Sequence, residues 1–185
     1  MRGWIDLFEG VLPSVLWHGS DTRIEGPYRA LTHFGTQAAA DQRADTVLRD
    51  WKRMPDPTHY DADGPVYADR FKWLHPVHLN LQNPLRIHDG VALEHSPIAL
   101  ADMLFYDLRV IYDHERSLIF RAGKFGQNLS DNRAAAAEIV RLLSAKGYDG
   151  FVYRNLHEDP GSESFVNFYP EQVTPAGEPL QFPAN

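Results

Sequence analysis

The chain has 185 residues, of which 43% are apolar and 23% are charged, and its formal net charge at pH 7 is −7. This composition is typical of a single globular domain and argues against a disordered chain. The absence of cysteine excludes disulfide bonds, thiolate metal sites and cysteine nucleophiles. The acidic net charge disfavours a broad basic face for nucleic acid. Since no apolar run is long enough for a membrane span or a signal peptide, we expect a cytoplasmic protein.

The first elements in chain order are a strand and a helix. Residues 14 to 18 form a short apolar run that ends beside Gly19 and Ser20, and this run predicts a strand. Residues 36 to 54 predict a helix in which Thr36 is the N-cap and which stops before Pro55. Residues 55 to 65 are rich in proline, aspartate and glycine, and we expect a loop there.

Residues 73 to 81 alternate in character, which predicts a strand. Odd-numbered positions from Trp73 to Leu81 share one face, whereas Leu74, His78 and Asn80 share the other. His75 and His78 therefore lie on opposite faces and are not expected to bind one metal ion.

The second half of the chain predicts two helices, two strands and a tail. We expect helices over residues 97 to 110 and 130 to 147, the second ending at Gly147, and strands over 151 to 154 and 164 to 169. The proline-rich tail from about residue 174 is expected to pack loosely. The order of elements, without repeats or linkers, indicates one α+β domain covering residues 1 to 185.

The common signatures of cofactor sites and hydrolases do not occur. The sequence contains no H-E-x-x-H, no phosphate-binding P-loop, no G-x-G-x-x-G and no G-x-S-x-G. We therefore expect no catalytic metal, and no effect of added zinc or magnesium.

Three separate segments are more informative in combination: "LWHGS" (16 to 20), "THFGTQAAADQR" (32 to 43) and "GYDGFVYRNLHEDPGSESFVNFYPEQV" (147 to 173). With "VHLNLQNPLRI" (77 to 87), they resemble the ADP-ribosyltransferase superfamily, and in particular the small domains of bacterial and phage polyvalent proteins and toxins. The resemblance implies two small mixed or antiparallel sheets that form a split cleft for NAD, with flanking helices. NAD would be the substrate and the protein would be an enzyme, whose biological setting the sequence leaves open between a toxin, a phage effector and a regulator.

The resemblance also implies where NAD is bound. His18 would hydrogen-bond the adenine-side ribose, Gly19 would let the backbone approach the nicotinamide amide, and Ser20 belongs to the same motif. In the second motif, His33 and Phe34 would lie near the nicotinamide ribose and ring, and Gly35 would provide the turn before the helix. The residues themselves leave alternatives open: His18 as a satisfied histidine, Phe34 as a core aromatic, and Arg43 as an exposed helix residue rather than a phosphate ligand.

Chemistry at the ribose needs a carboxylate, because cleavage of the nicotinamide bond passes through an oxocarbenium-like state. The candidates are Glu158, Asp159 and Glu163, in a segment that also supplies Asn155 and Ser164 to the NAD site. Better-known branches of the family place a glutamate where this chain has Ser164, and a one-residue shift along a strand reverses the face. The phage and bacterial polyvalent branch resembles "YRNLHEDPGSESF" (153 to 165) directly, and this resemblance implies that Glu158 or Asp159 is catalytic. The alternative is that all three acids form a solvated loop.

The expected activity is transfer of ADP-ribose to a macromolecule, with a protein acceptor favoured over nucleic acid by the net charge. The alternatives are an NAD glycohydrolase, an RNA 2′-phosphotransferase, and a non-catalytic binding protein that keeps the fold. The phosphotransferase lacks support because no paired histidine and arginine signature for a phosphate is present.

Overall fold

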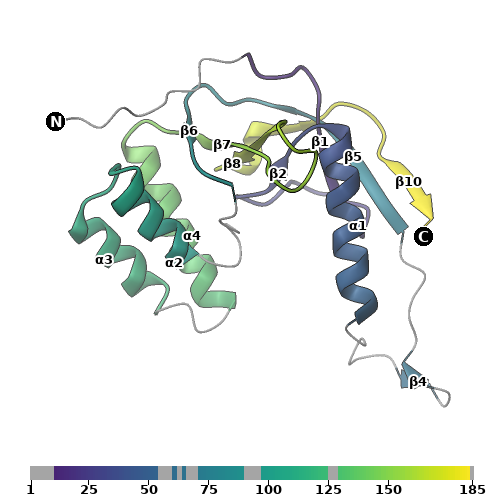
Figure 1. Ribbon diagram of the computed structural model, residues 1–185, viewed down its shortest axis with the longest axis horizontal. Helices are drawn as coiled ribbons and strands as arrows, with labels where there is room; N and C mark the ends of the chain where they lie inside the picture. The colour runs from purple at the N-terminus through teal and green to yellow at the C-terminus, as the bar shows by residue number, and fades with distance from the viewer. Residues whose placement is uncertain are drawn as a thin grey trace.

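The computed structural model describes residues 11–53, 60–61, 64–65, 71–89, 97–124 and 129–183. It is an α+β fold, as the sequence predicts, with two four-stranded sheets and a group of helices at one end (Figure 1). Within the described residues, no helix is both long enough and apolar enough to cross a membrane.

The first sheet is antiparallel and centres on β5 (Phe71–Leu79). One edge of β5 pairs with β1 (Leu16–Ser20), and the other pairs with β9 (Val173–Pro175) and β10 (Leu180–Pro183). Two expectations change here. The first strand starts and ends two residues later than predicted, because its pairing with β5 continues through Gly19 and Ser20. The tail is hydrogen-bonded to β5 as two strands instead of packing loosely, although the side chains of β10 are exposed.

Helix α1 (Gln37–Arg53) packs against β1 and β5 (Figure 1). Its start is as predicted, because the amide of Ala39 donates a hydrogen bond to the Thr36 hydroxyl (3.0 Å), which is the geometry of an N-cap. The buried side chains Ala40, Ala44 and Leu48 recur every four residues and so share one helix face.

The second sheet has the order β2-β8-β7-β6, from β2 (His33–Phe34), β8 (Glu163–Asn167), β7 (Gly150–Arg154) and β6 (Pro84–Arg86). It is mixed, since β6 and β7 are parallel and the other pairs are antiparallel. Asp149, just before β7, accepts hydrogen bonds from the amides of Gln82 (2.5 Å) and Asn83 (2.9 Å) and so fixes the loop that leads into β6.

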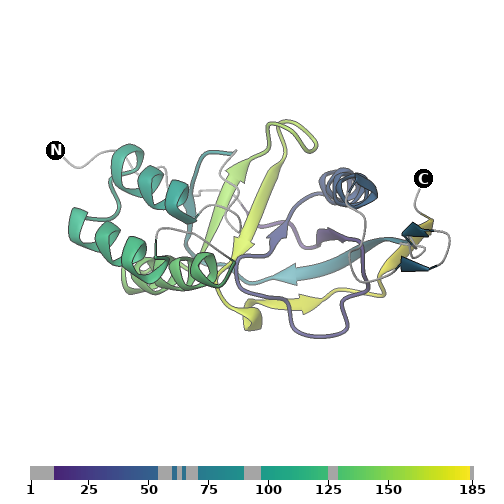
Figure 2. The same cartoon turned by 90° about the horizontal axis from the view of Figure 1, so that it is seen from below.

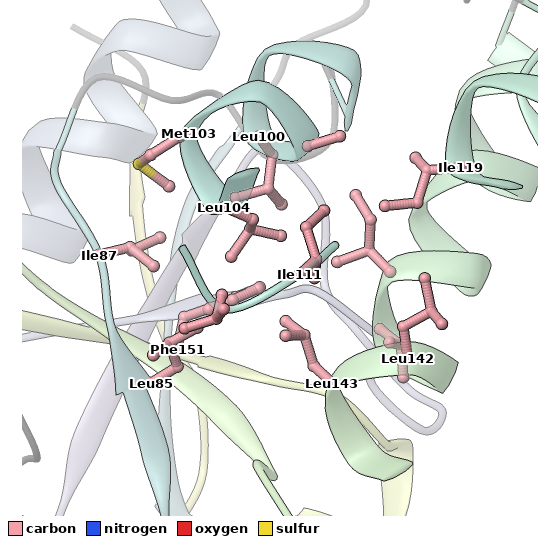
Figure 3. Close-up of a cluster of buried hydrophobic side chains, with 14 of the residues drawn as sticks. Leu85, Ile87, Leu100, Met103, Leu104, Ile111, Ile119, Leu142, Leu143 and Phe151 are labelled. Carbon is pink, nitrogen blue, oxygen red and sulfur yellow. The ribbon is translucent and has the colours of Figure 1, made fainter. Parts of the chain in front are cut away.

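Three α-helices and one π-helical turn cover one face of the second sheet. They are α2 (Pro97–Asp102), the π-helical turn η1 (Met103–Asp107), α3 (Asp113–Ala122) and α4 (Leu129–Ala145). Figure 3 shows their apolar side chains converging on Leu85 and Phe151 of the sheet. The predicted helix over 97 to 110 stops earlier, after the π-helical turn, and α3 was not predicted. Gly147 follows α4 with a positive φ of 91°, as expected at a helix end.

Three short elements complete the described structure. Strands β3 (Tyr60–Asp61) and β4 (Gly64–Pro65) pair with each other inside the predicted loop, most of which lies outside the described residues. A single 3-10 turn, η2 (Pro170–Gln172), connects β8 to β9.

The two sheets join where β1 meets β2. Trp17 and Gly35 exchange two backbone hydrogen bonds, of 2.9 and 3.0 Å, without a longer ladder. An apolar cluster that includes Leu16 and Val77 of the first sheet and Phe34, Val152 and Phe165 of the second packs around this joint. Figure 2 shows that the loop joining β7 and β8 extends to the same side as α1. The joint, this loop and α1 frame the candidate site.

Candidate functional site

A cleft of about 780 Å³ opens at the junction of the two sheets. Its walls come from β1 and the loop after it, from β2, from one face of α1, from the segment after β6 and from the β7–β8 loop. Nine of the twelve residues predicted for the NAD site line it: His18, Gly19, Ser20, His33, Phe34, Gly35, Arg43, Glu158 and Ser164. The other three, Asn155, Asp159 and Glu163, do not.

His18 lies in the middle of β1, not at a strand end, and its protonation state follows from its contacts. Its Nδ1 is 2.9 Å from the backbone carbonyl oxygen of His33. Because a carbonyl only accepts hydrogen bonds, Nδ1 carries the proton and Nε2 keeps a lone pair. Burial lowers the pKa of His18 to about 4, and the charge of Arg43 contributes to this shift. At neutral pH the side chain is therefore an uncharged hydrogen-bond acceptor at Nε2.

The burial of His18 comes from a group of rings that surrounds it. Tyr28 meets His18 edge-on at a centroid distance of 5.8 Å, Phe34 lies at 5.8 Å and His75 at 6.2 Å. His75 is itself buried, with Nε2 3.1 Å from the Ser20 hydroxyl. The aromatic neighbours hold the imidazole of His18 in one orientation.

Two glycines of the cleft are required by close packing. A Cβ at Gly19 would lie 1.9 Å from the carbonyl oxygen of Ala40, and a Cβ at Gly35 would lie 2.7 Å from the Ser164 hydroxyl. Gly19 thus lets α1 approach β1. This role in the fold is separate from the expected role of Gly19, which is to let a ligand approach the backbone. Gly35 lets β8 and α1 meet at the joint.

Two sets of side-chain hydrogen bonds lie beside the cleft. Nδ1 of His33 is 2.8 Å from the Tyr153 hydroxyl, and Tyr153 lies opposite Ser164 in the pairing of β7 with β8. Asn155 donates to the hydroxyls of Ser164 (2.9 Å) and Ser162 (2.8 Å). Burial raises the pKa of Tyr153 to about 12, so its hydroxyl stays protonated. Asn155 is buried behind the cleft, and it orients Ser164 instead of reaching a ligand.

Asp159 anchors the β7–β8 loop to α1. Its carboxylate accepts a hydrogen bond from the Thr36 hydroxyl at 2.5 Å, and its amide donates to the side chain of Gln42 at 3.0 Å. Its φ of +51° lies in the left-handed region, which aspartate tolerates better than most residues. At the other side of the loop, the amide of Leu156 donates to Asp89. Asp159 therefore positions the loop through its own side chain.

Glu158 is the predicted acid that lines the cleft. Its carboxylate is 3.7 Å from the Arg43 guanidinium across the opening between the loop and α1. Burial raises the pKa of Glu158 above its usual value, and the charge of Arg43 opposes that rise. The exposed fractions, 29% for the Glu158 side chain and 49% for that of Arg43, leave both groups open to a ligand.

Glu163 points to the other face of β8. Ser164, the next residue, lines the cleft, whereas the Glu163 carboxylate forms an ion pair with Arg86 at 2.7 Å. This is the reversal of faces expected from a one-residue shift along a strand.

Phe34 packs in the core between the two sheets, and only 1% of its surface is exposed. This burial favours the alternative that Phe34 is a core aromatic and not a ligand-binding residue.

The cleft contains residues that the sequence reasoning missed. They include Tyr28, Arg29, His88, Asp89, Tyr153 and His157. Tyr153 could have been found, because it shares a strand face with Phe151 and pairs with Ser164 across β7 and β8. Tyr28 sits in an irregular loop between β1 and β2, where no periodicity marks an inward-facing side chain.

Among the residues that the structure describes, no group of three or more histidine, aspartate or glutamate side chains could hold a metal ion. The expectation that added metal has no effect stays a prediction. In comparisons with known proteins, no family model, no curated protein and no solved structure matches the chain.

Proposed function

We propose that this protein is an NAD-dependent ADP-ribosyltransferase that cleaves the bond between nicotinamide and ribose and transfers ADP-ribose to a macromolecule. The observation that carries the proposal is the convergence of separate motifs on one cleft. Residues 18 to 20, 33 to 35 and 43, and 158 and 164 belong to three segments that are far apart in the sequence. All of them line the same 780 Å³ space.

His18 supports the binding half of the proposal. A ribose hydroxyl can donate a hydrogen bond to a neutral imidazole nitrogen, and Nε2 of His18 is such an acceptor. A protonated imidazole would present a donor at that atom instead. The low pKa keeps the acceptor form across the physiological pH range.

Glu158 supports the catalytic half. When the bond between C1′ of the ribose and the nicotinamide nitrogen breaks, its electron pair leaves with nicotinamide and positive charge develops on the ribose. A carboxylate beside the ribose stabilises that charge, and at about 4 Å and an effective dielectric near 20 the attraction is on the order of 4 kcal/mol. The acceptor then bonds to C1′ and loses a proton. Asp159, tied to Thr36, keeps Glu158 at the cleft.

The acceptor is proposed to be a protein, since the chain carries a net charge of −7, which would repel a nucleic acid. Water in place of the acceptor would make the same site an NAD glycohydrolase. A fold that binds a partner without cleaving NAD is the remaining alternative.

The test is incubation of the protein with a cell lysate and NAD labelled in the adenylate phosphate. The wild type is expected to release nicotinamide and to label a macromolecule, with the label sensitive to protease and resistant to nuclease. Glu158→Gln is expected to lose both signals, whereas the control Glu163→Gln keeps them. Nicotinamide release without labelling would assign a glycohydrolase, nuclease-sensitive label would assign a nucleic-acid acceptor, and neither signal in the wild type would contradict an enzyme.

A further inference from the structure

The side chain of Tyr28 is held rigidly at the edge of the cleft. It lies in the loop between β1 and β2, and only 8% of its surface is exposed. Its ring makes edge-on contacts with Phe34 at 5.4 Å, His18 at 5.8 Å and His75 at 6.4 Å. These contacts on several sides fix the direction of the hydroxyl.

The Tyr28 hydroxyl is the unusual part of this arrangement. It has no hydrogen-bond partner among the described residues. Within the same part of the chain, no buried side-chain nitrogen or oxygen lacks a partner. The hydroxyl of Tyr28 is therefore at a surface, and the surface that Tyr28 lines is the cleft. Burial of the ring raises the pKa of Tyr28 to about 12, so the hydroxyl keeps its proton and can donate it.

Tyr28 and His18 offer opposite hydrogen-bonding character side by side. Nε2 of His18 only accepts, because Nδ1 donates to the His33 carbonyl. The Tyr28 hydroxyl donates, and it can also accept. The two rings are nearly perpendicular, at 83°, and both line the cleft. Two neighbouring hydroxyls of a ligand, each of which can donate and accept, match this pair.

We propose that Tyr28 is a specificity-determining residue of the cleft, which with His18 recognises the adjacent 2′- and 3′-hydroxyls of an unphosphorylated ribose. One hydroxyl donates to Nε2 of His18 and its neighbour accepts from Tyr28. The inference rests on the proposed function for the identity of the ligand, since NAD carries such a ribose. It goes beyond that function by naming the residue that selects a ribose with free 2′- and 3′-hydroxyls.

The pair disfavours a ribose that carries a 2′-phosphate. An ionised phosphate ester has acceptor oxygens and no proton to donate, so it places lone pairs against the lone pair of His18. Arg43 is the cation whose charge acts on His18, but its guanidinium lies 3.7 Å from the Glu158 carboxylate and is paired there instead of with a phosphate. A deoxyribose loses one of the two hydrogen bonds and leaves its protein partner unsatisfied.

The experiment is an NMR or calorimetric titration with adenosine 5′-monophosphate, its 2′-deoxy and 3′-deoxy analogues, and adenosine 2′,5′-bisphosphate. The proteins are the wild type, Tyr28→Phe, and Tyr148→Phe as a matched control. Tyr148 also packs against the core and lies outside the cleft. Phenylalanine keeps the ring contacts of Tyr28 and removes only the hydroxyl.

The wild type is expected to bind the monophosphate at least about fivefold more tightly than each of the other three nucleotides, the effect of one hydrogen bond of ordinary strength. Tyr28→Phe should bind the monophosphate about fivefold more weakly and no longer distinguish one of the deoxy analogues. Tyr148→Phe should behave as the wild type.

Equal affinity of the wild type for all four nucleotides, or no binding of the monophosphate, would overturn the inference even if Tyr28→Phe failed to fold. So would a Tyr28→Phe variant that keeps every preference. These results are separable from the proposed function. A ribose preference that depends on Tyr28, in a protein that never cleaves NAD, would support the inference and contradict the transferase. NAD cleavage without a ribose preference would do the reverse.

Discussion

Two ends of the same sheet face have different surroundings. On the β2-β8-β7-β6 sheet, Phe151 and Val166 lie under α2, α3 and α4 in an apolar cluster (Figure 3). Further along this face, Ser164 and His33 line the cleft, and Tyr153 stands at the border between the two regions. Both ends are built from strands with the same alternation, and what covers them differs.

The comparison separates the residues that stabilise the fold from those that shape the candidate site. At the helical end, side chains contribute by burial of apolar area, which carries no directional requirement. At the cleft end, directed hydrogen bonds join His33 to Tyr153 and Asn155 to Ser164, and such bonds specify geometry. Substitutions at the helical end should act on folding, whereas substitutions at the cleft end should act on binding and turnover in addition to any effect on folding.

The largest effect is expected for Leu104→Ala at the helical end. Leu104 is fully buried in the cluster of Figure 3, and truncation of such a side chain costs about 2 to 5 kcal/mol of unfolding free energy. NAD affinity per folded molecule should not change. Urea denaturation and calorimetry measure the two quantities, and a loss of affinity in the folded variant would show that the two ends are coupled.

The next effect is a pH dependence at the cleft end. Because burial lowers the pKa of His18 from 6.5 to about 4, the unfolded chain binds a proton in this window that the folded protein does not. The free energy of unfolding should therefore fall as pH falls from 6.5 to 4, by at most about 3 kcal/mol from this residue. The lowered pKa of His75 acts in the same direction.

The measurement is the free energy of unfolding from urea titrations between pH 4 and 7. His18→Gln should reduce the slope relative to the wild type. A wild-type stability that rises on acidification through this window would contradict the account of His18.

Glu158→Gln is expected to lower turnover about a hundredfold, equivalent to about 2.7 kcal/mol, with little change in NAD affinity. The reason is that the carboxylate contributes in the transition state more than in the bound ground state. Since burial raises the pKa of Glu158, activity should also increase with pH as this carboxyl ionises. Steady-state kinetics of nicotinamide release across pH provide both readouts, and a variant with full turnover would eliminate the carboxylate mechanism.

The smallest effect is expected for Glu163→Gln, on the face of β8 that points away from the cleft. The variant weakens the ion pair with Arg86, and partly exposed pairs contribute about 0 to 1 kcal/mol to stability. Turnover should stay within about threefold of the wild type. If turnover instead falls as far as in Glu158→Gln, the assignment of faces along β8 is wrong.

Local patterns in the sequence predicted much of the fold. The alternation around Val77 gave β5, Thr36 marked the start of α1, and Gly147 marked the end of α4. The two strands of the tail were missed for a physical reason: β9 and β10 are short strands that exist through pairing with β5, which lies about a hundred residues earlier in the chain. Pairing between distant segments leaves no periodic trace in a short stretch.

The sequence predicted the candidate site to a similar extent as the fold. Motifs identified the segments that surround the cleft, but they could not assign roles within the β7–β8 loop. Glu158 and Asp159 are adjacent, yet one faces Arg43 in the cleft and the other binds Thr36 at the start of α1. A loop lacks the fixed alternation of a strand, so the direction of each acid depends on partners from other elements.

The central claim is that the cleft at the sheet junction binds NAD through His18, and the most direct measurement is an NMR titration with NAD up to millimolar concentration. The account predicts that the imidazole signals of His18 and His33 shift on binding, while those of His114 on the helical end do not. It predicts that His18→Ala remains folded and weakens binding by about 1 to 3 kcal/mol, the cost of an unpaired partner. No binding at millimolar NAD, or binding that His18→Ala leaves unchanged, would contradict it.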